Sequence, residues 1–474
     1  MKLFSLLKNI KCRIVGNPVV EIKGLYHNDT EVKDGGLFFC LRGTRVDGVN
    51  FVKSAIKNGA VAIVVESEIS NLVGVCQVVV KDARETMSRL ACKFFGNPAS
   101  KLKIIGVTGT NGKTTITNML KAVLDYAGHK TAVVGTNGVF FKDFKYETGM
   151  TTPDPIELQR YFSMMTKYKI EYVCMEVSAH AIDLKKLCGV EFVACVFTNL
   201  TEDHLDYFKN MDNYFVAKSK IFARPYTNLA AICVDDFYGR ELAKRINIPF
   251  CTYAINDDAD YKAEKIKMVG AGQKFYVKQT EFNINMAGRF NVLNALAVIG
   301  ILSELGFDVN KIAEGLDTLK GVDGRFNSFD IDGKLVIVDY AHTPDGLKNV
   351  LQTCREIVIN KKLFCVFGCG GNREKEKRAI MGRISSCLAD FTIITSDNPR
   401  FEKREDIAHD IECGFENQNY VIELDRAKAI KLAIDSAECG DVILIAGKGA
   451  ENYIDENGAK IPYCDLDEVK KYRR

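Results

Sequence analysis

Short apolar runs alternate with longer segments of mixed polarity along most of this chain. In the middle of the chain the apolar runs cover residues 104–107, 131–134, 172–175, 193–197 and 230–234. Continuous apolar runs of this length are typical of strands that are buried on both faces, and helix-length segments lie between several of them. The pattern predicts a parallel sheet covered by helices on both faces.

The last third of the chain repeats this pattern, whereas the first hundred residues are more mixed. In the last third we expect strands at residues 335–338, 363–367, 391–394 and 442–446, and helices at 377–389 and 426–437. Near the start, the runs at 36–43 and 60–66 are typical of short strands, with a helical segment at 51–57 between them.

Chain length and two turn-rich positions predict three domains. A chain of 474 residues corresponds to roughly three domains of about 150 residues each. Asn97-Pro98 and the pair Gly321 and Gly324 mark the boundaries. We therefore predict an α/β protein with a small mixed domain at 1–98, a central parallel-sheet domain at 99–322 and a second doubly wound domain at 323–474.

Composition and charge exclude several classes of protein. The 64 Lys and Arg residues nearly balance the 61 Asp and Glu residues, which argues against a nucleic-acid-binding protein. No apolar run approaches the length of a membrane span, and the first ten residues hold too short an apolar stretch for a signal peptide. The sixteen cysteines form no CxxC pair and lie mostly in apolar runs, which indicates reduced thiols and a cytoplasmic protein.

The segment from Gly106 to Thr115 has the features of a phosphate-binding loop. It reads Gly-Val-Thr-Gly-Thr-Asn-Gly-Lys-Thr-Thr, follows a predicted strand and opens a predicted helix. Backbone N–H groups can surround phosphates there, Lys113 can reach the outer phosphates, and Thr114 can offer its hydroxyl to Mg²⁺. The loop predicts the use of a nucleoside triphosphate and leaves the acceptor open.

Polar side chains follow several predicted strands, at the edge where ligands bind parallel sheets. Glu176 follows one strand and suits a magnesium site. His180, His204 and His342 are three of only six histidines, and each follows a strand end, which favours a functional role. Lys218 lies on a predicted helix, and composition alone indicates a solvated lysine.

The strands of the last third also end in charged residues. Their loops carry Arg373, Asp397, Arg400 and Glu451. Mixed charges suit a zwitterion such as an amino acid, whereas Asp397-Asn398-Pro399 equally fits an ordinary turn.

Together these segments resemble the Mur ligase family over nearly the whole chain. The matching segments are residues 109–115, 151–153, 176–180, 197–200, 203–207, 217–218, 290–292, 324–325, 339–344, 368–371 and 397–400. The resemblance implies a domain for a UDP moiety, a central ATPase domain of the phosphate-loop type and a C-terminal Rossmann-like domain for the incoming amino acid.

The resemblance also implies a reaction, that of an ADP-forming amide ligase of peptidoglycan synthesis, and hence a part in cell wall biogenesis, cell shape and cell division. ATP would phosphorylate the terminal carboxylate of UDP-N-acetylmuramoyl-L-alanyl-D-glutamate, and an amine would then attack the acyl phosphate. Residues 397–400 resemble the version that takes meso-diaminopimelate, whose extra carboxylate an arginine can bind bidentately. Mg²⁺ is the implied metal, and a monomer is expected.

The same resemblance assigns roles to single residues. The catalytic positions are Lys113, Glu176, His204 and Lys218, and Lys218 matches the family's carbamylated lysine. The ATP-binding positions are Gly109, Thr110, Asn111, Gly112, Lys113, Thr114, Thr115, Asn291, Arg325 and Asp339. The nucleotide-dipeptide positions are Asp29, Thr151, Thr152, Ser178 and Lys186. The amino-acid positions are Arg373, Asp397, Asn398, Pro399, Arg400, Gly447 and Glu451, and the metal positions are Thr114, Glu176, His204 and Lys218.

Several alternatives stay open. The same ligase could add L-lysine, which lacks the extra carboxylate, or the chain could be a homologue that binds without catalysis. A folylpolyglutamate synthetase is disfavoured by residues 397–400 and by the separate N-terminal domain. A GTPase switch is disfavoured because no Asn-Lys-x-Asp follows a strand.

Overall fold

The chain folds into two compact units. The computed structural model describes residues 1–43, 46–269, 272–358 and 360–473. Unit 1 comprises Met1–Gly106, His129–Ala194 and Lys220–Asn228, and unit 2 comprises Val107–Gly128, Cys195–Ser219 and Leu229–Arg474. The domain boundaries expected near residues 98 and 322 stay predictions. The two compact units do not test these boundaries, because both units contain segments of the expected central domain at 99–322.

Unit 1 contains a five-stranded sheet and a second group of strands. Its elements are α1 (Leu3–Leu6), β1 (Cys12–Val15), β2 (Gly24–Tyr26), β3 (Gly36–Phe39), α2 (Val52–Lys57), β4 (Ala60–Val65), β5 (Cys76–Val80), α3 (Ala83–Phe94), most of β6 (Lys103–Thr108), β7 (Thr131–Gly135), β8 (Gly138–Phe141), β9 (Phe144–Tyr146), α5 (Pro155–Lys167), β10 (Tyr172–Glu176) and α6 (Ala179–Asp183). The first sheet has the order β1-β5-β4-β3-β2, with β2 to β5 parallel and β1 antiparallel. In the second group β10 runs parallel to β7, and β8 and β9 continue it antiparallel.

The first sheet is buried on both faces because successive strand residues point to opposite sides. Leu37 and Phe39 pack with α1 and α3, whereas Phe38 packs with α2. The strand expected at 36–43 stops at Phe39, because the chain turns where Gly48 N donates to Leu41 O at 2.9 Å.

Unit 2 contains the phosphate loop and the whole last third of the chain. Its elements are α4 (Lys113–Tyr126), the end of β11 (Ala194–Phe197), α7 (Leu205–Phe208), α8 (Met211–Ser219), β12 (Ala230–Cys233), α9 (Phe237–Ala243), β13 (Phe250–Ala254), β14 (Tyr261–Lys262), β15 (Glu264–Val269), β16 (Gly272–Val277), β17 (Thr280–Ile284), α10 (Arg289–Glu304), α11 (Val309–Thr318), β18 (Asn327–Ile331), β19 (Lys334–Asp339), α12 (Pro344–Ile357), β20 (Leu363–Phe367), α13 (Glu376–Leu388), β21 (Phe391–Ile394), α14 (Arg404–Glu412), β22 (Tyr420–Ile422), α15 (Arg426–Ser436), β23 (Val442–Ala446), β24 (Tyr453–Glu456), β25 (Ala459–Pro462) and α16 (Asp465–Lys470). Strands β11 to β14 pair in parallel in chain order, and β15 to β17 form an antiparallel sheet.

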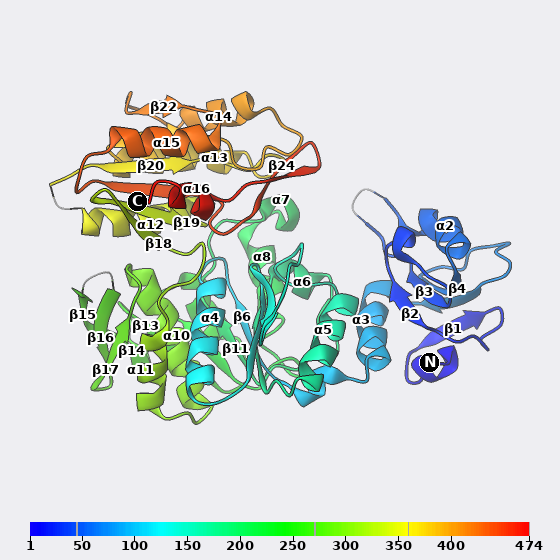
Figure 1. The fold of residues 1–474 in the computed structure, drawn as a ribbon. Helices are drawn as coiled ribbons and strands as arrows, with labels where there is room; N and C mark the ends of the chain where they lie inside the picture. The colour runs from blue at the N-terminus through cyan, green and yellow to red at the C-terminus, as the bar shows by residue number, and fades with distance from the viewer. Residues whose placement is uncertain (44–45, 270–271, 359, 474) are drawn as a thin grey trace. The chain divides into compact units, whose positions relative to one another are not determined.

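The six-stranded sheet of unit 2, drawn in yellow to red in Figure 1, has the order β18-β19-β23-β20-β21-β22. All neighbours are parallel except β18 and β19. Cys365 and Leu444 pack with α12, α13 and α14 on one face, and Val366 and Ile443 pack with α15 and α16 on the other. This confirms the expected α/β class, because the continuous apolar runs belong to strands covered by helices on both faces.

A fully buried ion pair joins α15 and α16 beside this sheet. Arg426 Nε and Nη2 each lie 2.7 Å from one carboxylate oxygen of Asp465, and both side chains have no exposed surface. Arg426 also donates to Ser396 O at 3.2 Å, just past the end of β21, and to Ala446 O at 2.9 Å, in the last residue of β23. The pair therefore holds the loops that follow two strands.

Removing one partner of this pair should be strongly destabilising. We expect Asp465→Ala to lower the free energy of unfolding by about 3–5 kcal/mol, because Arg426 would be left buried without its counter-charge. Urea unfolding followed by circular dichroism measures this. The exposed pair of Arg383 and Glu416, 3.6 Å apart, provides a control, and Glu416→Ala should cost less than about 1 kcal/mol. Equal effects of the two substitutions would contradict the prediction.

Candidate functional site

The predicted phosphate-binding loop lies in unit 2, between β6 and α4. Gly109 has φ +147° and Gly112 has φ +90°, a backbone conformation that disfavours side chains. A Cβ on Gly109 would lie 1.8 Å from Thr198 Oγ1. The loop therefore requires glycine where it passes the end of β11.

Thr198 and Asn199, directly after β11, hold this loop. Thr198 Oγ1 donates to Asn111 O at 2.6 Å, and Asn199 Oδ1 accepts from Asn111 N at 2.9 Å. Asn199 O accepts from Thr110 N at 3.0 Å. The sequence did not reveal that Thr198 and Asn199 hold the phosphate loop. The pattern that could have indicated it is a polar pair immediately after an apolar strand.

Two lysine amines meet at one carbonyl of the loop. Lys113 Nζ donates to Gly109 O at 2.9 Å and to Thr110 O at 2.7 Å. Lys218 Nζ, from α8, donates to the same Gly109 O at 2.9 Å. Anionic phosphate oxygens would be stronger acceptors for these amines than the neutral carbonyls are.

The side chain of Lys218 is buried, which corrects the expectation of a solvated helical lysine. Only 2% of its surface is exposed, and Nζ lies 4.8 Å from the centre of the Tyr214 ring. Burial, followed by the charge of Lys113, holds the pKa of Lys218 well below its ordinary value, against the opposing charge of Asp203. The sequence could not show that Lys218 is buried, because the pattern of a short helix does not reveal whether its polar side is covered by the rest of the protein.

Asp203 and His204 lie side by side directly before α7. His204 Nε2 lies 3.3 Å from Asp203 Oδ2, and His204 adopts φ +59°. Burial raises the pKa of Asp203, but the charges of His204, His342, Lys377 and Lys113 outweigh it and keep that pKa below its ordinary value. The structure thus brings two of the predicted histidines near one ionised carboxylate.

Two contacts join the phosphate loop to the last third of the chain. Arg325 Nη2 donates to Thr114 Oγ1 at 2.9 Å, and Asn111 Nδ2 donates to Asp345 Oδ2 at 3.0 Å. The guanidinium of Arg325 also lies 4.5 Å from the Tyr340 ring centre. These contacts place the predicted ATP-binding residue Arg325 beside the loop.

The other two predicted nucleotide positions are engaged within the protein. Asp339 accepts hydrogen bonds from Phe326 N and Ala341 N at 2.8 and 2.7 Å, and burial raises its pKa. Asn291 is fully buried, and its Nδ2 donates to Ala287 O at 2.7 Å. Asn291 therefore shapes the start of α10.

A buried network connects the loops after β21 and β23. Asn398 Nδ2 donates to Glu451 Oε2 at 2.9 Å, and Lys448 Nζ bonds to both Asn398 Oδ1 and Glu451 Oε2. Asp397 is also buried, and the positive charges of Lys448 and Arg426 keep its pKa below its ordinary value although burial opposes ionisation. A Cβ on Gly447 would lie 2.6 Å from Asp397 Oδ2. Sequence reasoning missed Lys448, which the fold buries completely.

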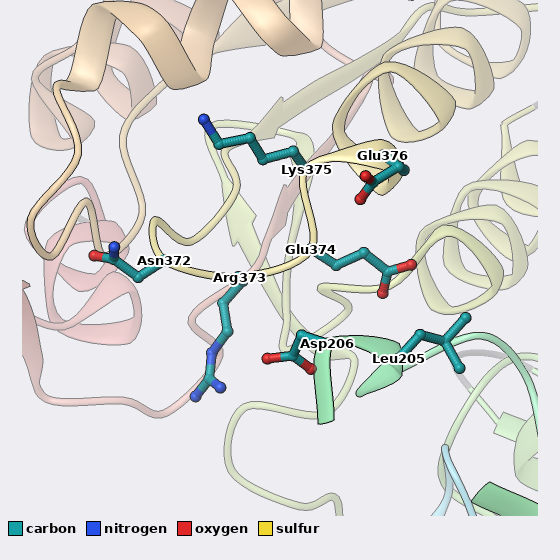
Figure 2. A pocket seen from close by; sticks show the side chains of 7 residues that line it. All are labelled: Leu205, Asp206, Asn372, Arg373, Glu374, Lys375 and Glu376. Atoms are coloured by element: carbon teal, nitrogen blue, oxygen red, sulfur yellow. The ribbon is translucent and has the colours of Figure 1, made fainter. Parts of the chain in front are cut away.

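Arg373 and Arg400 approach one another on neighbouring loops. A Cβ on Gly370 would lie 2.8 Å from Arg400 Nη1 and 3.8 Å from Arg373 Cγ. Arg373 also lines a cavity of about 490 Å³, whose lining residues are Leu205, Asp206, Asn372, Arg373, Glu374, Lys375 and Glu376. Figure 2 shows the residue 372–376 loop facing Asp206 across this cavity. The cavity has charged groups of both signs, as a zwitterionic ligand requires.

Unit 1 brings together four of the other predicted residues. Glu176 is buried and accepts from Thr136 N and Thr136 Oγ1, both at 3.0 Å. Thr136 Oγ1 lies 3.1 Å from Thr151 Oγ1. Thr152 Oγ1 donates to Glu176 O and accepts from Ser178 N, both at 3.0 Å. Hydroxyl groups and a carboxylate therefore converge at the end of β10.

Lys186 and Asp29 occupy different surroundings within unit 1. Lys186 Nζ lies 2.8 Å from Asp154 Oδ1, and only 10% of its side chain is exposed. Asp29 begins the 3₁₀ helix Asp29–Glu31, where its carbonyl accepts from Asn58 Nδ2 at 2.9 Å.

The described part of the chain contains neither a cluster of metal-binding side chains nor a membrane-spanning helix. Within residues 1–43, 46–269, 272–358 and 360–473, no three His, Cys, Asp or Glu side chains gather as a metal site. Among the same residues, no helix is long and apolar enough to cross a membrane.

Because the pKa of Lys218 is lowered, the stability of the folded protein should depend on pH. Between that pKa and its ordinary value the unfolded chain binds more protons than the folded chain, so this group makes stability rise with pH. In CO₂-free buffer, we expect Lys218→Met to be more stable than wild type near pH 7, with the difference shrinking as the pH approaches 10. Thermal unfolding from pH 7 to 10 measures it, and a constant difference would contradict it.

The chain is similar to known proteins over nearly its whole length. Residues 21–95 match the Mur ligase family, catalytic domain; residues 107–302 match the Mur ligase middle domain; and residues 324–449 match the Mur ligase, glutamate ligase domain. A Syntrophomonas wolfei protein named UDP-N-acetylmuramoyl-L-alanyl-D-glutamate--2,6-diaminopimelate ligase is 40% identical, over 96% of this chain and 95% of that protein. A Clostridium acetobutylicum protein with the same name, numbered 1, is 41% identical over the same shares.

Solved structures agree with this relationship. The structure of a UDP-N-acetylmuramoyl-L-alanyl-D-glutamate--2,6-diaminopimelate ligase aligns with a TM-score of 0.68 and 30% identity, over 100% of this chain and 98% of that chain. The MurF ligase from Thermotoga maritima in complex with ADP shares the fold, with a TM-score of 0.65 and 20% identity over 94% of this chain and 96% of that one. The 40–41% identity to the two curated relatives, over 96% of the chain, shows that the chain belongs to the Mur ligase family.

Proposed function

We propose that this protein is an ATP-dependent amide ligase that adds meso-diaminopimelate to UDP-N-acetylmuramoyl-L-alanyl-D-glutamate in peptidoglycan precursor synthesis. The observation that carries the proposal is the 40–41% identity, over 96% of the chain, to relatives named for these substrates. The glycine-dependent loop with its two lysines supports the use of ATP. Since the acceptor is a nucleotide-activated precursor, we assign the reaction to the cytoplasm, and a monomer remains the expectation.

The proposed reaction has two steps. A carboxylate oxygen of the D-glutamyl residue attacks the γ-phosphorus of ATP, the bond to the β–γ bridging oxygen breaks, and ADP leaves. The amino group of diaminopimelate then attacks the acyl carbon of the resulting acyl phosphate. Inorganic phosphate leaves as the amide forms, and the attacking amine gives up a proton.

The phosphate loop supplies the groups for the first step. The N-terminus of α4 would direct backbone N–H groups and a partial positive charge toward the phosphates. Lys113 would exchange the carbonyls of Gly109 and Thr110 for phosphate oxygens, as the stronger acceptors. This concentrates positive charge where negative charge develops during transfer.

Within unit 2, we propose Thr114, His204 and Lys218 as residues that hold magnesium, and Glu176 stays a prediction for this role. Mg²⁺ prefers oxygen ligands, which the Thr114 hydroxyl supplies directly. Burial favours the neutral amine of Lys218, which is the form that can add to CO₂, lose a proton and become a carbamate with carboxylate-like oxygens. Bound Mg²⁺ would offset the charge of the transferring phosphoryl group.

Arg400 is our choice for recognition of the third amino acid. Its Nη1 donates to Gly371 O at 2.8 Å, and 26% of its side chain is exposed, so the guanidinium is oriented yet reachable. Glu451 lies in the adjacent network with Asn398 and could pair with the distal ammonium group. A site with both charge signs suits the distal end of diaminopimelate, which carries a carboxylate and an ammonium group.

Phosphate release tests the proposed function. The purified protein is supplied with ATP, Mg²⁺ and the nucleotide dipeptide, and then with meso-diaminopimelate or L-lysine, while mass spectrometry identifies the product. We expect amide formation with meso-diaminopimelate, and none with folded Lys113→Ala, whose loop lacks the phosphate-binding amine. Preference for L-lysine would replace the proposed substrate, and no amide with either amino acid would indicate a homologue that binds without catalysis.

The carbamate on Lys218 makes a separate prediction. We expect Lys218→Ala to lose most of its ligase activity and to recover part of it when a short-chain carboxylate, such as acetate, is added. The small anion can occupy the space of the missing side chain and supply oxygen ligands. Lys220→Ala, on an exposed lysine two residues away, is the control and should show no acetate dependence. Full activity of Lys218→Ala without acetate would remove the carbamate from the mechanism.

Selectivity between amino acids tests Arg400. Diaminopimelate differs from lysine at this site mainly by one carboxylate, and a charge-assisted contact to it contributes about 1.5–3 kcal/mol, or roughly 10–150-fold in affinity. Arg400→Ala should therefore lose most of the preference for diaminopimelate through the kcat/KM of that substrate, while the KM for ATP stays unchanged. The measurement is kcat/KM for both amino acids, and an unaltered ratio would show that Arg400 does not read the carboxylate.

A further inference from the structure

Two neighbouring loops of unit 2 carry the arginines assigned to the amino-acid site. Loop A, residues 370–373, follows β20, and loop B, residues 398–402, follows β21. Gly371 N donates to Asn398 O at 2.9 Å. A Cβ on Gly371 would lie 1.9 Å from Pro399 O, so the two backbones touch with no room for a side chain.

A buried arginine outside both loops binds them together. Arg378, in α13, has no exposed side-chain surface. Its Nη1 and Nη2 bind the two carboxylate oxygens of Glu402, in loop B, at 3.0 and 3.1 Å. Nη2 also donates to Gly370 O in loop A at 3.2 Å, and Nη1 donates to Asp410 Oδ2 in α14 at 2.8 Å.

Glu402, in loop B, also bonds directly to the backbone of loop A. Its Oε1 accepts a hydrogen bond from Asn372 N in loop A. The hydrogen bonds from Arg378, together with that of Asn372, outweigh partial burial and lower the pKa of Glu402 to about 2. Glu402 is therefore ionised at neutral pH, and each of its oxygens holds a group that belongs to loop A or to Arg378.

Arg400 depends on this arrangement for its orientation. It has φ +52°, a left-handed conformation that costs free energy for a residue with a side chain. Hydrogen bonds from Arg400 N to Asp455 O at 2.9 Å and from Asn457 N to Arg400 O at 2.6 Å hold this backbone. The guanidinium is oriented separately, because Nη1 donates to Gly371 O in loop A at 2.8 Å. If loop A shifts relative to loop B, this contact and the direction of the guanidinium change together.

We propose that Glu402 is a positioning residue for the third amino acid, which with Arg378 locks loops A and B together so that Arg400 meets the distal carboxylate of the substrate. The proposal rests on the proposed function, because it assigns to Arg400 the recognition of that carboxylate. Glu402 itself touches no substrate in this scheme. Its effect is transmitted through the two backbones and Arg400.

Glu402→Gln and Asp410→Asn form a matched pair of variants. Glu402→Gln keeps the shape of the side chain but turns one acceptor oxygen into an N–H donor that faces Arg378 or Asn372 N, so the loops lose a contact. Asp410→Asn neutralises a carboxylate on the same guanidinium, but Asp410 bonds to neither loop in the described part of the chain. Asp410→Asn should lose less thermal stability than Glu402→Gln, because Asp410 accepts one of these hydrogen bonds and Glu402 accepts three.

The kinetic effects should differ between the two variants. We expect Glu402→Gln to lower kcat/KM for meso-diaminopimelate by roughly 10- to 100-fold, mainly through KM, with little change for L-lysine or in the KM for ATP. Asp410→Asn should keep the wild-type selectivity. Adding Glu402→Gln to Arg400→Ala should cause almost no further loss, because coupled residues are not additive.

Each outcome decides a different point. Additive losses in the double variant, or equal losses for both amino acids, would overturn the positioning role and leave the proposed function intact. Altered selectivity in Asp410→Asn would show that the guanidinium charge, not the loop contact, is responsible, and would also overturn it. Failure of the wild type to form an amide with any amino acid would remove the proposed function together with this inference.

Discussion

Lysine and arginine side chains donate hydrogen bonds to backbone carbonyls at or just past the ends of parallel strands in unit 2. Lys113 and Lys218 share Gly109 O in the phosphate loop, and Arg426 binds Ser396 O and Ala446 O. Arg378 and Arg400 do the same for Gly370 O and Gly371 O. Because a buried carbonyl without a donor is costly, these side chains stabilise the phosphate loop and the loops that follow β20 and β21.

This arrangement also sets the electrostatics of the ligand-binding edge. Amines and guanidinium groups that satisfy carbonyls bring positive charge to the same place, and neighbouring cations then repel one another. Lys218 shows the result, since burial and the nearby Lys113 both favour its neutral form. Asp203 and Asp397 show the converse, because surrounding cations keep them ionised against the cost of burial. An anionic ligand at this edge would relieve repulsion that the free protein carries.

The fold was largely predictable from the sequence, and the buried charges were not. Continuous apolar runs such as those of β20 and β23 predict strands well, because a strand covered on both faces tolerates few polar residues. The glycines and Lys113 of the phosphate loop were equally visible, because their chemistry requires a fixed spacing. Arg378, Arg426 and Lys448 gave no signal, since a charged residue on a helix or in a loop is usually solvated and only tertiary packing buries it. The same limit explains why composition suggested a solvated Lys218.

The unused hydrogen-bonding capacity of each cation separates those that shape loops from those that can bind a ligand. Arg426 directs Nε, Nη1 and Nη2 to acceptors within the protein and has no exposed surface, so it has nothing to offer a substrate. Arg400 donates Nη1 to Gly371 O, its Nε lies 3.8 Å from Asp455 Oδ2, and a quarter of its side chain remains exposed. Within the residues that the structure describes, Nη2 of Arg400 donates to no acceptor. A carboxylate that approached this end of the guanidinium would find donors already oriented by the protein, which lowers the entropy lost on binding. Discrimination at the amino-acid site therefore depends on how firmly the surrounding loops hold a partly exposed arginine.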